Sequence, residues 1–151
     1  MIDHLKLTPW QFDQEELEGS WRHADDGGNP QLAFELILSY LAAYADGDNW
    51  KPETPEGGMS SQVRPWLLHW HAGQVAAFQS RYDTAIEQMT TCICLGPEPT
   101  FQAYARGTVC FLRGDREGLN AEIQNTYGKN RELLQKFLAG MDTGKTYAQA
   151  Y

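Results

Sequence analysis

The sequence predicts an all-α protein built from antiparallel helix pairs, on three observations. Apolar residues recur at three- and four-residue spacing along several segments, and no useful length of chain alternates apolar and polar residues as a strand would. Gly73 and Gly107 stand 34 residues apart, each followed 12 residues later by Ala85 or Leu119. With 151 residues, 42% of them hydrophobic, the chain is long enough to form one domain with its own core.

Two helices are predicted in residues 1–45, which we expect to form an N-terminal acidic pair. The first extends from Pro9 to about Ala24, because Thr8 is a suitable N-cap and proline is favoured at the first helical position. The second extends from Pro30 to about Ala45. This second segment is apolar nearly all round, which is typical of a helix buried on most sides.

Residues 46–61 are predicted to form a long loop, because they hold five glycines and prolines and no apolar periodicity. Residues 62–128 are predicted to form two helix pairs. The first three helices of this region extend from Gln62 to about Gln79, from Tyr82 to about Leu95, and from Thr100 to Leu112.

The last quarter of the chain is predicted to end the stack. Asp115 is a plausible N-cap for a short helix that reaches Tyr127, with a break at Gly128. Asn130 to Met141 has a one-sided apolar face, which is typical of a capping helix, so residues 129–151 are assigned that role. The tail, Thr143 to Tyr151, forms a last short helix or frays.

The 34-residue period with two helices per unit resembles the tetratricopeptide repeat, whose pattern runs Trp-x2-Leu-Gly-x2-Tyr, then Ala-x3-Phe, then Pro. The first unit matches at Gly73, Ala85 and Pro97, and the second keeps Gly107 but has Leu119 in place of the small residue. This resemblance implies a short superhelix of stacked pairs that binds another protein. A helical bundle with a chance 34-residue echo is the alternative.

In the resembled family the first helix of each pair lines a concave groove. In this register the groove would be uncharged and rich in aromatic side chains, which suits an apolar helix or segment of a partner, anchored by Trp70 and Tyr104. The alternative is that the N-terminal pair or the tail fills the groove and makes these residues core. The eight predicted groove residues are Leu67, Trp70, Gln74, Phe78, Phe101, Tyr104, Thr108 and Phe111.

Negative charge is concentrated before the repeat. Residues 1–61 carry 12 Asp and Glu against 3 Lys and Arg, whereas residues 62–151 carry 8 against 9. Because phosphate binding needs clustered Lys and Arg, this distribution argues against nucleic acid and favours a basic partner. Glu15, Glu16 and Glu18 are the predicted acidic contact surface. A solvated surface that only aids solubility is the alternative.

Motifs for nucleotide and metal binding do not have the context that they need. Residues 139–146 end in Gly-Lys-Thr, but an amphipathic helix precedes them where a phosphate-binding loop follows a strand. His69 and His71 are two residues apart on a predicted helix, so their side chains diverge, and Cys92 and Cys94 have the same spacing. No metal and no cofactor are therefore expected.

A catalytic group is not expected either. His23 with Asp25 and Asp26 is the best candidate, but these residues fall at a glycine-rich helix end where Asp commonly caps. The sequence therefore predicts a non-catalytic protein-interaction module, of an immunity, antitoxin, chaperone or adaptor type. An enzyme or small-ligand binder with a pocket between the N-terminal pair and the repeat is the alternative.

A cytoplasmic location is expected. No apolar run approaches the ~20 residues that span a bilayer, and Met1 to Trp10 lacks a signal-peptide layout. Cys92, Cys94 and Cys110 are an odd number in predicted helices, which indicates small buried hydrophobes in a reducing compartment rather than a disulfide framework.

Overall fold

The computed structural model describes residues 3–44 and 63–151, and every regular element in these ranges is a helix. The predicted all-α class is therefore confirmed. The predicted loop at 46–61 lies outside the described residues. In chain order the elements are η1 (His4–Lys6), α1 (Pro9–Gln14), α2 (Trp21–Asp26), α3 (Pro30–Tyr44), α4 (Pro65–Phe78), α5 (Tyr82–Cys94), α6 (Pro99–Arg113), α7 (Arg116–Gln124), α8 (Gly128–Asp142) and α9 (Tyr147–Ala150).

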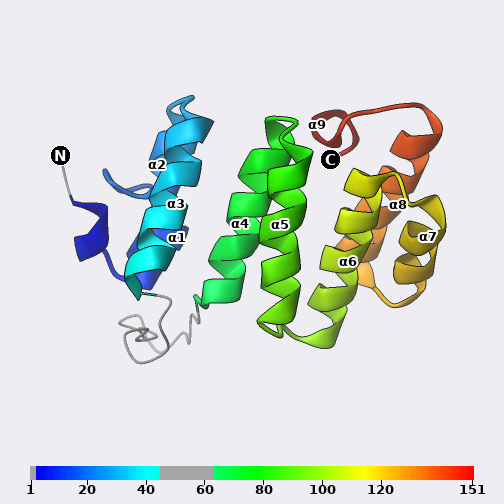
Figure 1. Ribbon diagram of the computed structural model, residues 1–151, viewed down its shortest axis with the longest axis horizontal. Coiled ribbons are helices and arrows are strands. Elements are labelled where there is room, and N and C mark those ends of the chain that lie inside the picture. The colour runs from blue at the N-terminus through cyan, green and yellow to red at the C-terminus, as the bar shows by residue number, and fades with distance from the viewer. Residues whose placement is uncertain (1–2, 45–62) are drawn as a thin grey trace.

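The helices stand side by side along the long axis of the molecule, from the N-terminal group at one end to α6, α7 and α8 at the other (Figure 1). The long helices α3 to α6 alternate in direction, and each packs against the next. The short helix α9 turns back from α8 and reaches α4. One hydrophobic core, from Leu7 to Ala150, joins all these layers.

The predicted single helix from Pro9 to about Ala24 is wrong, because the structure divides it into α1 and α2. Helix α1 starts as expected, with a capping box between Thr8 and Gln11. It ends at Gln14, after which Glu15 is extended, and Ser20 then caps α2 by accepting a hydrogen bond from the His23 amide at 3.2 Å. Gly19, with φ of 92°, permits the turn between the two helices.

Local signals place the other helices close to their predicted bounds. Proline occupies the start of α4 and of α6, where its missing N–H costs nothing. The predicted start at Gln62 therefore moves to Pro65. Asp115 caps α7 as predicted, accepting a hydrogen bond from the Gly118 amide at 2.9 Å.

Gly73 and Gly107 each allow a close contact between two helices, but the partner helix differs. A Cβ added at Gly73 would lie 2.6 Å from Met89 Cγ and 3.2 Å from the Ala85 carbonyl oxygen, so α4 and α5 pack closely as the repeat register predicts. A Cβ at Gly107 would instead lie 2.6 Å from Leu134 Cδ1, on α8. The second pair therefore does not repeat the geometry of the first.

None of the described helices is both long enough and apolar enough to cross a bilayer.

Candidate functional site

The eight predicted groove residues differ widely in exposure. Trp70, Tyr104, Thr108 and Phe111 are buried, with exposed fractions of 7% or less. Leu67, Gln74 and Phe101 are half-buried. Phe78 is the exception, since 46% of it is exposed. The residues at the centre of the predicted groove are therefore buried in the protein interior. The exposed residue, Phe78, lies at the C-terminal end of α4.

The centre is buried because α4 and α6 pack their aromatic faces against each other. The ring centroid of Trp70 lies 5.2 Å from that of Phe101 and 5.0 Å from that of Tyr104. The ring of Trp66 also packs against that of Phe101, with the two centroids 4.9 Å apart. These tilted and edge-on contacts are the favourable geometry for aromatic pairs, and they bury Trp70 and Tyr104 within the protein itself.

Helix α9 covers the remainder of this inner face. The side chain of Tyr147 is fully buried, and its ring lies 5.1 Å from Phe78, 6.4 Å from Phe111 and 5.3 Å from Phe137. The backbone N–H of Tyr147 donates to the Tyr82 hydroxyl at 2.9 Å. The tail thus forms a short helix that packs on predicted groove residues. This is the arrangement expected from the alternative hypothesis, in which the tail fills the groove.

Two exposed aromatic side chains remain at the edge of this covered region. Phe78 and Tyr151 are 46% and 43% exposed, and their rings meet edge to face at 5.2 Å. Gln74 donates a hydrogen bond to the Tyr151 hydroxyl at 3.4 Å. Phe78 and Tyr151 together form what we call the aromatic ridge.

A hollow of about 450 Å³ adjoins the ridge, between the N-terminal helices and α4. Val75 and Phe78 supply an apolar wall, and Asp25 supplies a carboxylate whose pKa is raised by burial and by the neighbouring charge of Asp26. The hollow lies in the region where the sequence placed the pocket of the alternative hypothesis. Its lining residues are Asp25, Gly28, Pro30, Val75, Phe78 and Gln79, and we call the hollow and the ridge the junction surface.

The predicted acidic surface lies apart from the junction surface. Glu15, Glu16 and Glu18 occupy the connection between α1 and α2, where Glu16 and Glu18 are exposed and Glu15 is half-buried. Asp25 lies at the opposite end of α2. The structure therefore brings none of these three glutamates into the region of the eight groove residues, and sequence reasoning missed Asp25 as a surface carboxylate.

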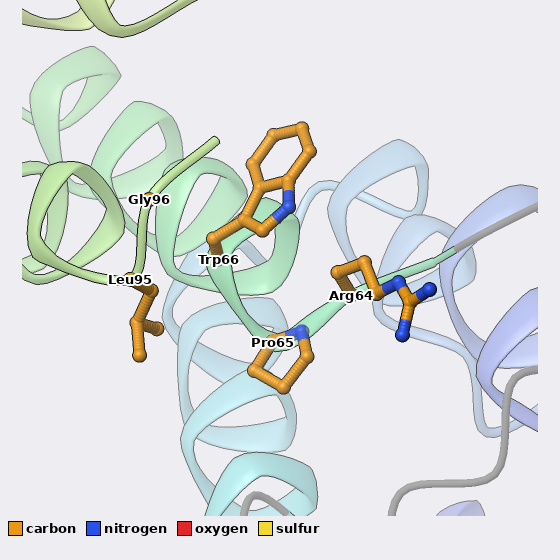
Figure 2. A pocket seen from close by; sticks show the side chains of 5 residues that line it. All are labelled: Arg64, Pro65, Trp66, Leu95 and Gly96. Atoms are coloured by element: carbon orange, nitrogen blue, oxygen red, sulfur yellow. The ribbon is translucent and has the colours of Figure 1, made fainter. Parts of the chain in front are cut away.

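A second hollow, of about 290 Å³, lies where α4 begins and α5 ends. Figure 2 shows Pro65 and Trp66 on one side of it and Leu95 and Gly96 on the other, with the Arg64 side chain extending away from Leu95. The walls are mainly apolar and include no carboxylate, imidazole or thiol. We assign no chemistry to this hollow.

A buried polar cluster links the N-terminal helices to α4. The Asp13 carboxylate is fully buried, and its Oδ1 atom accepts hydrogen bonds from Trp21 Nε1 at 3.0 Å and from His71 Nδ1 at 2.8 Å. Burial raises the pKa of Asp13, but the hydrogen bond and charge of His71, with hydrogen bonds from Trp21 and Gln14, outweigh it and hold the pKa below 3.8. Sequence reasoning missed Asp13, because nothing local predicts a partner 58 residues away.

The structure does not assemble the catalytic and metal motifs considered from the sequence. His71 bonds to Asp13 on α1, whereas His69 bonds to Gln88 on α5 at 2.8 Å, so the two imidazoles do diverge. His23 lines a hollow on α2 and α3 that does not include Asp25. Within residues 3–44 and 63–151 no three metal-binding side chains gather.

The cysteines are free in the described structure. Cys92 is buried, and burial raises the pKa of its thiol to about 12, while burial and the nearby Asp115 raise that of Cys110 to about 11. Both thiols stay protonated at neutral pH, which makes them poor nucleophiles. Cys94 is exposed and Cys110 is half-buried, so the expectation that all three are buried is correct only for Cys92.

The fold and site define an all-α protein of stacked antiparallel helix pairs with an exposed aromatic ridge. Comparison of the chain with protein-family models, with curated proteins and with solved structures finds no match.

Proposed function

We propose that this chain is a non-catalytic protein-binding module whose partner contacts the junction surface. One observation carries the proposal: Phe78 and Tyr151, two large aromatic side chains, are more than 40% exposed and in contact beside a hollow that contains a carboxylate. Aromatic side chains combine large contact area with few rotatable bonds, and they dominate the energetics of many protein interfaces.

The chemistry of the junction surface suggests the chemistry of the partner. Val75 and Phe78 would accept an apolar side chain, and Asp25 would pair with a lysine or arginine close to it. The net charge of residues 1–61, 12 acidic against 3 basic, would attract such a basic segment from a distance. The partner we propose is therefore a protein segment that combines an apolar and a basic residue.

The 34-residue period and the stacked helix pairs support a tetratricopeptide-like module within this proposal. An immunity, antitoxin, chaperone or adaptor role fits a small acidic binding protein of this kind. We also propose a cytoplasmic location, which the free cysteines support because disulfides are rare in reducing compartments.

The test is to capture partners from source-cell lysate with the wild-type chain and with Phe78→Ala and Asp25→Asn. Tyr127→Ala is the matched control, because Tyr127 is 71% exposed and lies at the start of α8, outside the junction surface. We expect a partner retained by the wild type and the control to be lost with Phe78→Ala and weakened with Asp25→Asn. Asp25→Asn is the deciding variant, because Phe78 also contacts the buried Tyr147 ring and its loss lowers the melting temperature as well. A partner retained equally by all variants would contradict the proposal.

The alternative function is a small-ligand binder that uses the same hollow. The observation that favours it is the hollow's volume of about 450 Å³, which falls within the usual range of ligand pockets. A thermal-shift screen with small amines and apolar cations would reveal it. Stabilisation by such a compound that is lost in Asp25→Asn would favour the ligand over the protein partner.

A further inference from the structure

Helix α9 is a separate short element seated on the aromatic inner face. Its four residues, Tyr147–Ala150, follow α8 after a turn at Thr143–Thr146 in which Gly144 has a φ of 70°. Tyr147 and Ala150 face inward and are buried, whereas Ala148 and Gln149 are exposed. Isolated helices of this length are unstable in water, so α9 depends on the surface beneath it.

The polar contacts of α9 with the rest of the chain are few and incomplete. The Tyr147 backbone N–H bonds to Tyr82 at 2.9 Å, and Tyr151 receives the 3.4 Å bond from Gln74. The Tyr147 hydroxyl is buried without a hydrogen bond of normal geometry among the described residues, and the nearby Gln74 side chain only partly offsets the rise in its pKa that burial causes. An unsatisfied buried hydroxyl costs about 1 to 3 kcal/mol, which weakens the docking of α9 relative to the longer helices.

The surface beneath α9 contacts it through uncharged, apolar groups that fit its shape. Phe78, Phe111 and Phe137 receive the Tyr147 ring. Gly140 receives Ala150 so closely that a Cβ at position 140 would lie 2.8 Å from the Ala150 Cβ. Tyr147, Ala150 and Tyr151 are three and four residues apart, which places them on one face of a helical turn.

We propose that this surface is a binding site for an uncharged helical turn of a partner protein, and that α9 is its internal ligand, which the partner displaces. The partner's turn would carry an aromatic residue, a small residue three positions later and an aromatic residue at the fourth position, as α9 does with Tyr147, Ala150 and Tyr151. The inference goes beyond the proposed function, although the two surfaces share Phe78 and the displaced tail carries Tyr151 of the aromatic ridge.

The experiment measures binding of a labelled peptide with the sequence of residues 143–151 to full-length proteins. Two variants loosen α9 without changing the receiving surface: Tyr147→Ala removes the buried ring, and Ala150→Leu collides with Gly140. Ala148→Leu is the matched control, because it makes the same change on the exposed side of α9. A second peptide with Ala in place of Tyr147 tests the need for the aromatic ring.

We expect both loosened variants to bind the peptide at least tenfold more tightly than the wild type and Ala148→Leu, and the second peptide to bind none of them. The peptide is supplied at up to about 1 mM, the effective concentration that a short linker gives an attached segment. Absence of binding to well-folded Tyr147→Ala at that concentration would overturn the proposal.

Hydrogen exchange of the wild-type protein is a second test, which does not require that the variants fold. We expect the α9 amides to exchange at least tenfold faster than those at the centre of α8, through local opening. Exchange of α9 only with global unfolding would overturn the proposal. Neither result depends on whether a partner binds the junction surface, so the two proposals fail separately.

Discussion

Asp13 is a single buried carboxylate that joins three helices. It lies on α1, accepts hydrogen bonds from Trp21 on α2 and His71 on α4, and is completely shielded from solvent. A buried carboxylate is tolerated only when such bonds compensate its lost hydration. The cluster therefore attaches the N-terminal helices to the repeat-like part through one specific geometry.

Replacing this carboxylate should destabilise the protein. Asp13→Ala leaves the Trp21 and His71 donors without their acceptor, so we expect the free energy of unfolding to fall by at least about 1.5 to 3 kcal/mol, the worth of one hydrogen bond to a charged group. Chemical denaturation measures the loss. Glu16→Ala, an exposed carboxylate three residues on, should stay within about 0.5 kcal/mol of the wild type.

The same residue makes stability sensitive to acid. The pKa of Asp13 in the folded state is below its ordinary value of 3.8, so the unfolded chain takes up the proton first as the pH falls. The stabilisation is therefore complete above about pH 4 and is lost as the pH drops towards the folded-state pKa. Denaturation between pH 5 and 2 should show a steeper loss for the wild type than for Asp13→Asn; parallel curves would contradict this assignment.

Two buried tyrosines should respond oppositely to loss of the hydroxyl. The Tyr147 hydroxyl has no hydrogen bond of normal geometry in the described structure, so Tyr147→Phe should leave stability unchanged or raise it by about 1 to 3 kcal/mol. The Tyr40 hydroxyl donates to the Leu7 carbonyl at 2.8 Å, so Tyr40→Phe should lower stability by a similar amount. Thermal melts compare the pair, and equal losses would mean that Tyr147 has a partner after all.

At the scale of elements, the two repeat-like units differ in what their glycines contact. Gly73 packs within its own pair, against Ala85 and Met89, whereas Gly107 packs against Leu134 of α8. Leu119, which stands where the first unit has Ala85, is fully buried. Its bulk is compatible with the observed difference, in which Gly107 of α6 makes its close contact with α8 rather than with α7.

A double-mutant cycle distinguishes these contacts. Gly107→Leu should cost about 1 to 3 kcal/mol by overpacking, and Leu134→Ala about 2 to 5 kcal/mol by leaving a cavity. Together they should cost clearly less than the sum, because each relieves the other. Gly73→Leu combined with Leu134→Ala should instead be additive within about 0.5 kcal/mol. Additivity in both cycles, measured by denaturant unfolding, would reject the Gly107 contact.

At the scale of the whole molecule, charge and aromatic surface are distributed unevenly. The acidic excess belongs to residues 1–61, and the exposed aromatic ridge is formed by Phe78 and Tyr151 on α4 and the tail. The hollow of the junction surface is lined by residues 25–30 of the N-terminal helices and by residues 75–79 at the end of α4. A basic partner would therefore be attracted by one part of the molecule and held at the boundary with the other.

Once a partner is captured, its association rate should depend on salt. We expect the rate to fall as ionic strength rises, and charge reversal of Glu15, Glu16 and Glu18 to slow it further, because exposed charges act mainly on encounter. Stopped-flow mixing at several salt concentrations measures this. A rate independent of salt would assign the acidic residues to solubility instead.

The sequence by itself determined the helical class and most helix bounds, because these depend on local chemistry. Proline at the starts of α4 and α6 and the Asp115 cap of α7 act within one turn of chain. The division of the first predicted helix is also locally encoded, by Gly19 and Ser20. The prediction rested on the start signals at Thr8 and Pro9 and did not use these two residues.

Only the tertiary structure decided which aromatic residues are core and which are surface. The same α4 helix carries Trp70, which α6 buries, and Phe78, which remains 46% exposed at the helix end. Phe111 packs against Tyr147 of α9, which lies more than 30 residues later in the sequence. His71 bonds to Asp13, which lies 58 residues earlier. Periodicity describes the faces of each helix, but burial depends on which other helix covers a face, and that is a property of long-range packing.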